Sequence, residues 1–171
     1  TGSGTQTLSG ANTYSGDTTV LDGILRTGAN HVLPDASAIH VTATGTGVTA
    51  LLDLNGNADS ILSLNLGGST PSVSIGAGTL TLLGNVTYDA TNDPLGATIS
   101  GGTLALGAST RTFAVGNSAS ADDDLTVSAA VTGSGSAGLQ KTGVGTMRLT
   151  AANTYTGNTN VNEGTLLVSG S

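Results

Sequence analysis

The sequence predicts an all-β fold, a right-handed parallel β-helix (β-solenoid) of about seven coils, and three observations support this prediction. Short apolar segments alternate residue by residue with polar ones, as at Leu62, Leu64 and Leu66, which is typical of half-buried strands. No window of a dozen residues shows the periodicity of a helix. The chain also repeats itself, with copies that start near residues 4, 78 and 145, and such repetition favours one unit stacked on itself.

The clearest repeat relates the beginning of the chain to its end. Aligned without a gap, Gly4–Gly28 and Gly145–Ser169 are identical at 12 of 25 positions. A more divergent copy begins at Gly78 and carries an insertion around Asp89–Leu95. We therefore expect residues 1–171 to form a single β-solenoid domain. The residues expected to define its repeat structurally are Asn12, Tyr14, Gly16, Gly145, Asn153, Tyr155, Gly157 and Gly164.

Strands are expected wherever apolar residues occur at every second position. In chain order these residues are Leu62, Leu64 and Leu66; Val73 and Ile75; Leu80 and Leu82; Leu104 and Leu106; Phe113 and Val115; Leu125, Val127, Ala129 and Val131; Met147 and Leu149; Leu166 and Val168. The turns between them are rich in Gly, Asn, Asp and Ser, which tolerate left-handed backbone angles or hydrogen-bond their own backbone. An antiparallel sandwich could use the same strands. Near-identical turns favour a β-helix instead, because equivalent residues then stack as ladders, Asn on Asn and Thr on Thr.

The predicted core is narrow and aliphatic, because aromatic residues make up only 2% of the chain. Thr126 is expected to face solvent between two inward-pointing neighbours. The residues expected to point inward include Leu64, Leu82, Leu106, Val127 and Leu149.

Charge and composition exclude several functions. The net charge of −7, from 11 acidic and 4 basic residues, argues against binding to nucleic acid or insertion into an anionic membrane surface. No apolar run approaches the roughly 20 residues of a membrane span, and no signal peptide is visible. The chain has no cysteine. Because it begins and ends inside the repeat pattern, we expect it to be a section of a longer protein.

The last repeat contains a specific motif, Lys-x-Gly-x-Gly-Thr-x-x-Leu from Lys141, followed by Asn-Thr-Tyr-x-Gly from Asn153 and by Thr-x-Val and Gly-x-Leu. This pattern resembles the passenger-associated transport repeat, also called the autotransporter-associated β-strand repeat. The resemblance covers essentially the whole chain. The resemblance implies a fold and a secretion class, and it implies neither catalytic residues nor a cofactor.

Three groups of residues were considered as sites. Asp122, Asp123 and Asp124 form the only charge cluster; a solvated corner is the simplest interpretation, and a weak cation site is the alternative. Asp53–Asp59 has ligand-type residues at every second position but lacks the Gly and Glu of a calcium-binding EF-hand loop. His31 and His40 lie near no Gly-x-Ser-x-Gly motif, so we expect neither to be catalytic; His31 is expected in the loop before Leu33.

Other polar and aromatic side chains also have a structural interpretation. Tyr14 and Tyr155 occur at equivalent turns, where we expect them to cover the ends of the core, although rings at such places could also bind sugars. Lys141 and Arg148 flank the glycines of the last repeat, and we expect both at the surface with their stems over apolar edges.

The resemblance implies a structural stalk in the passenger of an autotransporter-type protein, at the cell surface of a Gram-negative bacterium or secreted from it. Such repeats would promote passage across the outer membrane, which anchors the full-length protein, and hold other modules away from the cell. The expected partners are other segments of the same polypeptide. Two alternatives remain: an adhesin that binds a glycan or a host-surface protein along the rod, and a less favoured polysaccharide-active enzyme. Unpaired strands at the two ends, Thr1–Leu8 and Thr165–Val168, also predict head-to-tail self-association.

Overall fold

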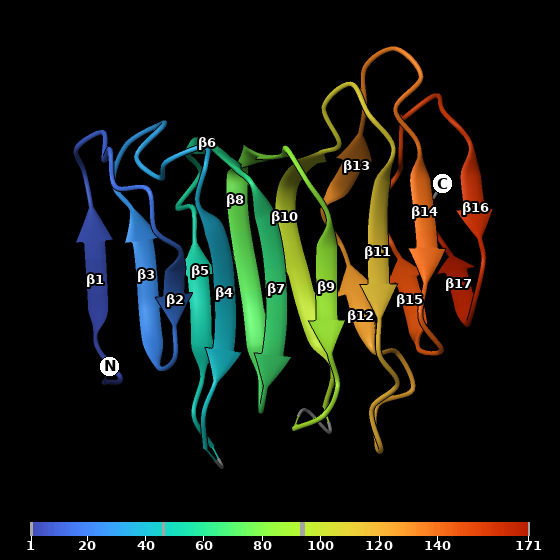
Figure 1. Ribbon diagram of the computed structural model, residues 1–171, viewed down its shortest axis with the longest axis horizontal. Helices are drawn as coiled ribbons and strands as arrows, with labels where there is room; N and C mark the ends of the chain where they lie inside the picture. The colour runs from blue at the N-terminus through green and yellow to red at the C-terminus, as the bar shows by residue number, and fades with distance from the viewer. Residues whose placement is uncertain (1, 46, 93–94, 171) are drawn as a thin grey trace.

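The chain forms two long parallel β-sheets that face each other across a narrow core (Figure 1). The computed structural model describes residues 2–45, 47–92 and 95–170. Across these ranges the chain consists of strands, turns and loops, and it contains no helix that could span a membrane. The two ends of the chain lie at opposite ends of its long axis.

The first sheet follows a path of successively paired strands. In pairing order they are β1 (Thr5–Leu8), β3 (Gly23–Thr27), β5 (Ala50–Asp53), β8 (Pro71–Leu82), β10 (Ala97–Ala105), β12 (Leu125–Val127), β15 (Thr146–Leu149) and β17 (Thr165–Val168). Two short strands extend this sheet sideways: β6 (Ala58–Ile61) pairs with β8, and β13 (Ala130–Thr132) pairs with β10.

The arrows of the second sheet point in the opposite direction to those of the first in Figure 1. Its strands, in pairing order, are β2 (Thr18–Val20), β4 (Ala38–Ala43), β7 (Ser63–Gly68), β9 (Val86–Asp89), β11 (Arg111–Val115), β14 (Leu139–Thr142) and β16 (Thr159–Val161).

Apart from β6 and β13, which follow strands of their own sheet, successive strands alternate between the two sheets, and every strand pair in the described residues is parallel, for example β3 with β5 and β4 with β7. Parallel pairing of strands that return to the same sheet once per turn is the arrangement of a solenoid. The prediction of an all-β parallel β-solenoid is therefore confirmed. The chain makes about six turns, slightly fewer than the seven coils expected.

The core consists of inward-facing rows in which one apolar residue of each coil stacks on the next. In the first sheet one row places the following residues in register: Leu25, Leu52, Val73, Ile99, Val127 and Leu149. All of them are buried, as are the predicted core residues Leu64, Leu82 and Leu106. Tyr88 and Phe113 are the only aromatic residues in the described core, which is otherwise aliphatic as predicted. Thr126 is half-buried on the outer face.

The long strands β8 and β10 bend where two glycines pair. Gly76 and Gly101 face each other across the ladder, and both have positive φ, at 70° and 74°. A Cβ at Gly101 would lie 2.8 Å from the carbonyl oxygen of Gly76, so no larger residue fits. The bend carries the second halves of both strands to β6 and β13, which form a third, shorter side of the coil.

In the paired strands that the structure describes, Thr stacks on Thr, as at Thr79 and Thr103 and at Thr146 and Thr165, whereas no Asn pairs with Asn. The turn asparagines instead hydrogen-bond the backbone of an adjacent coil. Asn30 Oδ1 accepts from the N–H of Ala58 at 2.8 Å, and Asn85 Oδ1 accepts from the N–H of Thr112 at 2.9 Å. A buried or half-buried backbone N–H group at a turn needs a hydrogen-bond acceptor. The side-chain amide of each of these asparagines is therefore oriented towards that N–H group.

Candidate functional site

The glycines of the last repeat lie where one coil approaches the backbone of the coil before it. A Cβ added at Gly145, Gly157 or Gly164 would lie 2.2, 2.3 and 2.4 Å from the nearest carbonyl oxygen of that coil. Gly16, the first-repeat equivalent of Gly157, has no atom within 4 Å of such a Cβ. Glycine is therefore required at Gly145, Gly157 and Gly164, because the backbone of the neighbouring coil leaves no space for a Cβ. Gly16 makes no such contact within this chain.

This difference predicts opposite outcomes for two matched substitutions. Gly157→Ala forces a Cβ into the backbone of Ser136 and Ala137, and we expect it to lower the free energy of unfolding by about 2–3 kcal/mol. Gly16→Ala meets open space and should change that free energy by less than about 0.5 kcal/mol. Chemical denaturation of both variants checks the prediction, and equal effects would contradict the observed coil contact.

The repeated Asn and Tyr residues form the same local bonds in both copies. The hydroxyls of Tyr14 and Tyr155 lie 2.7 Å from those of Thr18 and Thr159, respectively. Asn12 donates to the carbonyl of Gly10, and Asn153 donates to the equivalent carbonyl of Ala151, both at 2.8 Å.

The two tyrosines differ in burial. Tyr155 is half-buried and packs against the core, whereas Tyr14 is 39% exposed. Tyr155 thus occupies the place at the edge of the core that the sequence suggested for both rings.

Lys141 is buried, so its expected position at the surface was wrong. It lies in the inward row of the second sheet, in register with Phe113 and, through it, with Val86. Its Nζ donates to the carbonyl oxygens of Thr142, Gly143 and Glu163 at 2.9, 2.6 and 3.2 Å. Each of the three N–H groups of the Lys141 ammonium thus has a carbonyl acceptor, and the carbonyl of Glu163 belongs to the next coil.

Burial lowers the pKa of Lys141, while the carboxylates of Glu163 and Asp124 act in the opposite direction. A signal for this burial was present in the sequence: Lys141 follows Leu139 at the two-residue spacing that places alternate side chains on one face of a strand.

The acidic cluster is not a solvated corner, and that interpretation was wrong for two of its three residues. Asp124 is buried, and its two carboxylate oxygens accept from the backbone N–H groups of Ser118 at 2.6 Å and Thr146 at 2.7 Å. Asp123 is half-buried and forms an ion pair with Arg148 Nε at 2.5 Å. Only Asp122 is exposed. Both carboxylate oxygens of Asp124 and Oδ2 of Asp123 thus have protein partners, whereas Oδ1 of Asp123 is buried without a hydrogen-bond partner.

Asp124→Asn is expected to lower the free energy of unfolding by about 2 kcal/mol, because an amide has one acceptor oxygen for two buried N–H donors. Asp122→Asn is the matched control and should be neutral. Both are compared by thermal unfolding in EDTA and again in millimolar calcium. An unchanged Asp124→Asn variant, or a shift of many degrees on adding calcium, would contradict this account.

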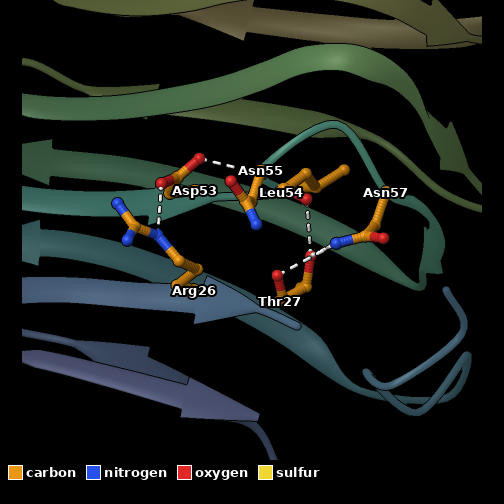
Figure 2. A network of polar contacts seen from close by, with 6 residues as sticks. All are labelled: Arg26, Thr27, Asp53, Leu54, Asn55 and Asn57. Atoms are coloured by element: carbon orange, nitrogen blue, oxygen red, sulfur yellow. Dashed lines mark hydrogen bonds and ion pairs between the residues drawn. The ribbon is translucent and has the colours of Figure 1, made fainter. Parts of the chain in front are cut away.

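Asp53–Asp59 also forms protein contacts, shown in Figure 2. One carboxylate oxygen of Asp53 accepts from Arg26 Nε and the other from the N–H of Asn55, both at 2.8 Å. Asn57 donates to the carbonyl of Thr27 at 3.0 Å, and the hydroxyl of Thr27 donates to the carbonyl of Leu54 at 2.7 Å. This network joins the ends of β3 and β5, so the segment is a coil corner.

Asp59 is buried at the end of the same segment. Its carboxylate accepts from the N–H groups of Val32 and Leu33, both at 3.1 Å, and burial raises its pKa. His31 lies in the loop before Leu33, as expected, and His40 lies on the outer face of the second sheet, 3.5 Å from Asp17. Within the described ranges, no three His, Asp or Glu side chains form a metal-binding group.

The basic side chains are all held by partners within the molecule. Arg26 and Arg148 form ion pairs with carboxylates, and Lys141 is enclosed by carbonyl groups. Arg111 donates to the carbonyl of Leu106 through Nε at 2.8 Å and to that of Leu83 through Nη1 at 2.6 Å.

A groove of about 910 Å³ lies on the outer face of the second sheet, over β4, β7 and β9. Two rows of residues, each in register from coil to coil, form its floor. The first row is His40, Asn65 and Thr87, and the second is Thr42, Gly67 and Asp89. Because Gly67 has no side chain, the second row is interrupted between Thr42 and Asp89. The sequence does not predict this groove, because the groove depends on which residues three coils place side by side.

Comparison with known proteins identifies the family to which this chain is similar. The model of the passenger-associated-transport-repeat family matches residues 1–26, 75–106 and 139–168. The adhesin BmaC autotransporter of Brucella suis biovar 1 (strain 1330) is 32% identical over 166 residues. That alignment covers 96% of this chain but 4% of the adhesin, so the chain spans a small part of the length of this relative. No solved structure matches the chain.

Proposed function

Because the chain belongs to the passenger-associated-transport-repeat family, we propose that it is a structural segment of the passenger of an autotransporter-type bacterial protein. In this function the protein is at the cell surface or secreted, and its full-length form is anchored in the outer membrane. The solenoid holds other modules away from the cell, and its folding outside the cell favours passage across the membrane.

Coil-to-coil pairing is the observation that supports this proposal most strongly. In both sheets each strand between the two ends of the pairing path pairs with the equivalent strands of the coils before and after it, so each coil can serve as a template for the next. Stability then accumulates as coils are added, which disfavours backward movement of a chain that folds on one side of a membrane.

We assign no enzymatic activity to the chain. Hydrolysis of a polysaccharide needs a pair of carboxylates that face the substrate. The buried carboxylates of Asp59 and Asp124 instead accept hydrogen bonds from the backbone N–H groups of Val32, Leu33, Ser118 and Thr146.

Surface display tests the proposal. The chain would be fused, with an N-terminal epitope tag, between a signal peptide and an autotransporter translocator, and antibody binding to intact cells would be measured. We expect efficient display of the parent and of Thr126→Asp, but reduced display and periplasmic accumulation of Leu149→Asp. Equal display of all three would show that folding of this segment does not assist its export.

The groove on the second sheet favours a second candidate function, adhesive binding. It is concave, its volume is within the range of known ligand sites, and its floor has hydrogen-bonding side chains from three coils.

A further inference from the structure

The side chains on the groove floor define the chemistry of a ligand. Asn65 offers an amide donor and an amide acceptor, and Thr42 and Thr87 offer hydroxyls that do both. Asn65 and Thr42 are half-buried, and Thr87 is exposed, so these groups are accessible from outside. Because they are on successive strands, neighbouring groups are separated by the strand spacing of about 4.8 Å.

Charge in the groove excludes anionic ligands. Asp89 is exposed at one end of the second row of the floor, and hydrogen bonds from the hydroxyl and N–H of Thr91 lower its pKa, so it stays ionised at neutral pH. Neither Lys nor Arg occurs among the lining residues that the structure describes. A sialylated or sulphated ligand would therefore meet an unpaired negative charge, whereas hydroxyl groups can donate to Asp89.

Small and apolar groups complete the surface. Gly67 is buried between Thr42 and Asp89 and projects no side chain into the groove, and Ala43 and Leu95 border the groove, with Leu95 66% exposed. A sugar ring combines hydroxyls at its edge with apolar C–H groups on its face. This combination matches a floor of amide and hydroxyl groups beside exposed aliphatic carbon.

We propose that this groove binds a neutral linear saccharide, laid across β4, β7 and β9 so that successive sugar rings meet successive coils. The proposal rests on the adhesive function given above as the second candidate. The ring at β7 lies over Gly67, where no side chain projects, and its hydroxyls reach Asn65 and Asp89.

A glycan array tests this proposal with the purified 171-residue chain. It would carry neutral gluco-, galacto- and manno-oligosaccharides with their sialylated and sulphated counterparts, and titration calorimetry would follow with the strongest neutral binder. We expect binding to neutral oligosaccharides. Binding to no glycan, or preferential binding to sialylated or sulphated ones, would overturn the proposal.

Gly67→Leu is the decisive variant, because it fills the gap without a strained backbone. Gly67 has no positive φ, and the nearest contact of an added Cβ is 3.4 Å, with the carbonyl oxygen of Asp89. We expect at least a tenfold loss of affinity, as also for Asn65→Ala, which carries the test if Gly67→Leu fails to fold. Gln140→Leu, a half-buried position outside the groove, is the control and should bind as the parent does. Unchanged affinity in both groove variants would overturn the proposal.

Adhesion of chain-coated beads to epithelial cells, before and after enzymatic removal of surface glycans, separates this inference from the function on which it rests. Adhesion lost on glycan removal and in Gly67→Leu supports both. Adhesion that survives glycan removal leaves the adhesive function standing and overturns the saccharide site. No adhesion together with no glycan binding overturns both.

Discussion

Leu149→Asp is expected to unfold the chain under conditions in which the parent is folded. Leu149 is 1% exposed and is the last buried residue of a row that passes through Val127 and Ile99, since Val168, the next residue in register, is exposed. A carboxylate there has no partner and loses the packing of the Leu side chain, at a cost of about 4–5 kcal/mol or more. Since small domains are stable by only about 5–15 kcal/mol, this is a large fraction of the total.

Thr126→Asp is the matched control for this prediction, because Thr126 lies on the outer face of the strand beside Val127. We expect it to cost less than about 1 kcal/mol. Denaturant unfolding followed by far-UV circular dichroism measures both variants. Equal damage from the two would mean that the alternation of inward and outward residues is wrong.

Lys141→Met is expected to lower the free energy of unfolding by about 3 kcal/mol, even though Met suits an apolar row better than Lys does. The substitution leaves the carbonyl groups of Thr142, Gly143 and Glu163 without the ammonium that they surround. We expect the loss of these three partly buried hydrogen bonds to destabilise the fold by more than removal of the buried charge stabilises it. Gln140→Met, on the opposite face of the same strand, should be nearly neutral.

The pH dependence of stability gives a second test of Lys141. Burial lowers its pKa in the folded state below the ordinary value of 10.5, so between the two values the unfolded chain binds more protons at this group. The free energy of unfolding contributed by Lys141 therefore rises as the pH is raised towards 10.5. Lys141→Met should remove this part of the alkaline pH dependence, and an unchanged profile would contradict the assignment.

The period-two alternation predicted the core because it is a local property of each strand. Val127 and Leu149 required only that their neighbours be polar. Lys141 and Asp124 were misplaced because their partners come from other coils: Glu163 for the lysine, and Thr146 for the aspartate. These contacts depend on the register between neighbouring coils. Residue type alone does not predict that register. The groove depends on the same register across β4, β7 and β9.

The positions of the basic residues also determine how susceptible the folded protein is to cleavage by trypsin. Trypsin cleaves after Lys and Arg, and it must draw several flanking residues into its active site in an extended, unpaired form. Arg26, Arg111, Lys141 and Arg148 all lie in hydrogen-bonded strands, namely β3, β11, β14 and β15. All trypsin cleavage sites of the folded chain therefore lie in strands. Cleavage at any of them requires local unfolding of a coil. A protein built in this way can remain intact among proteases of the same specificity.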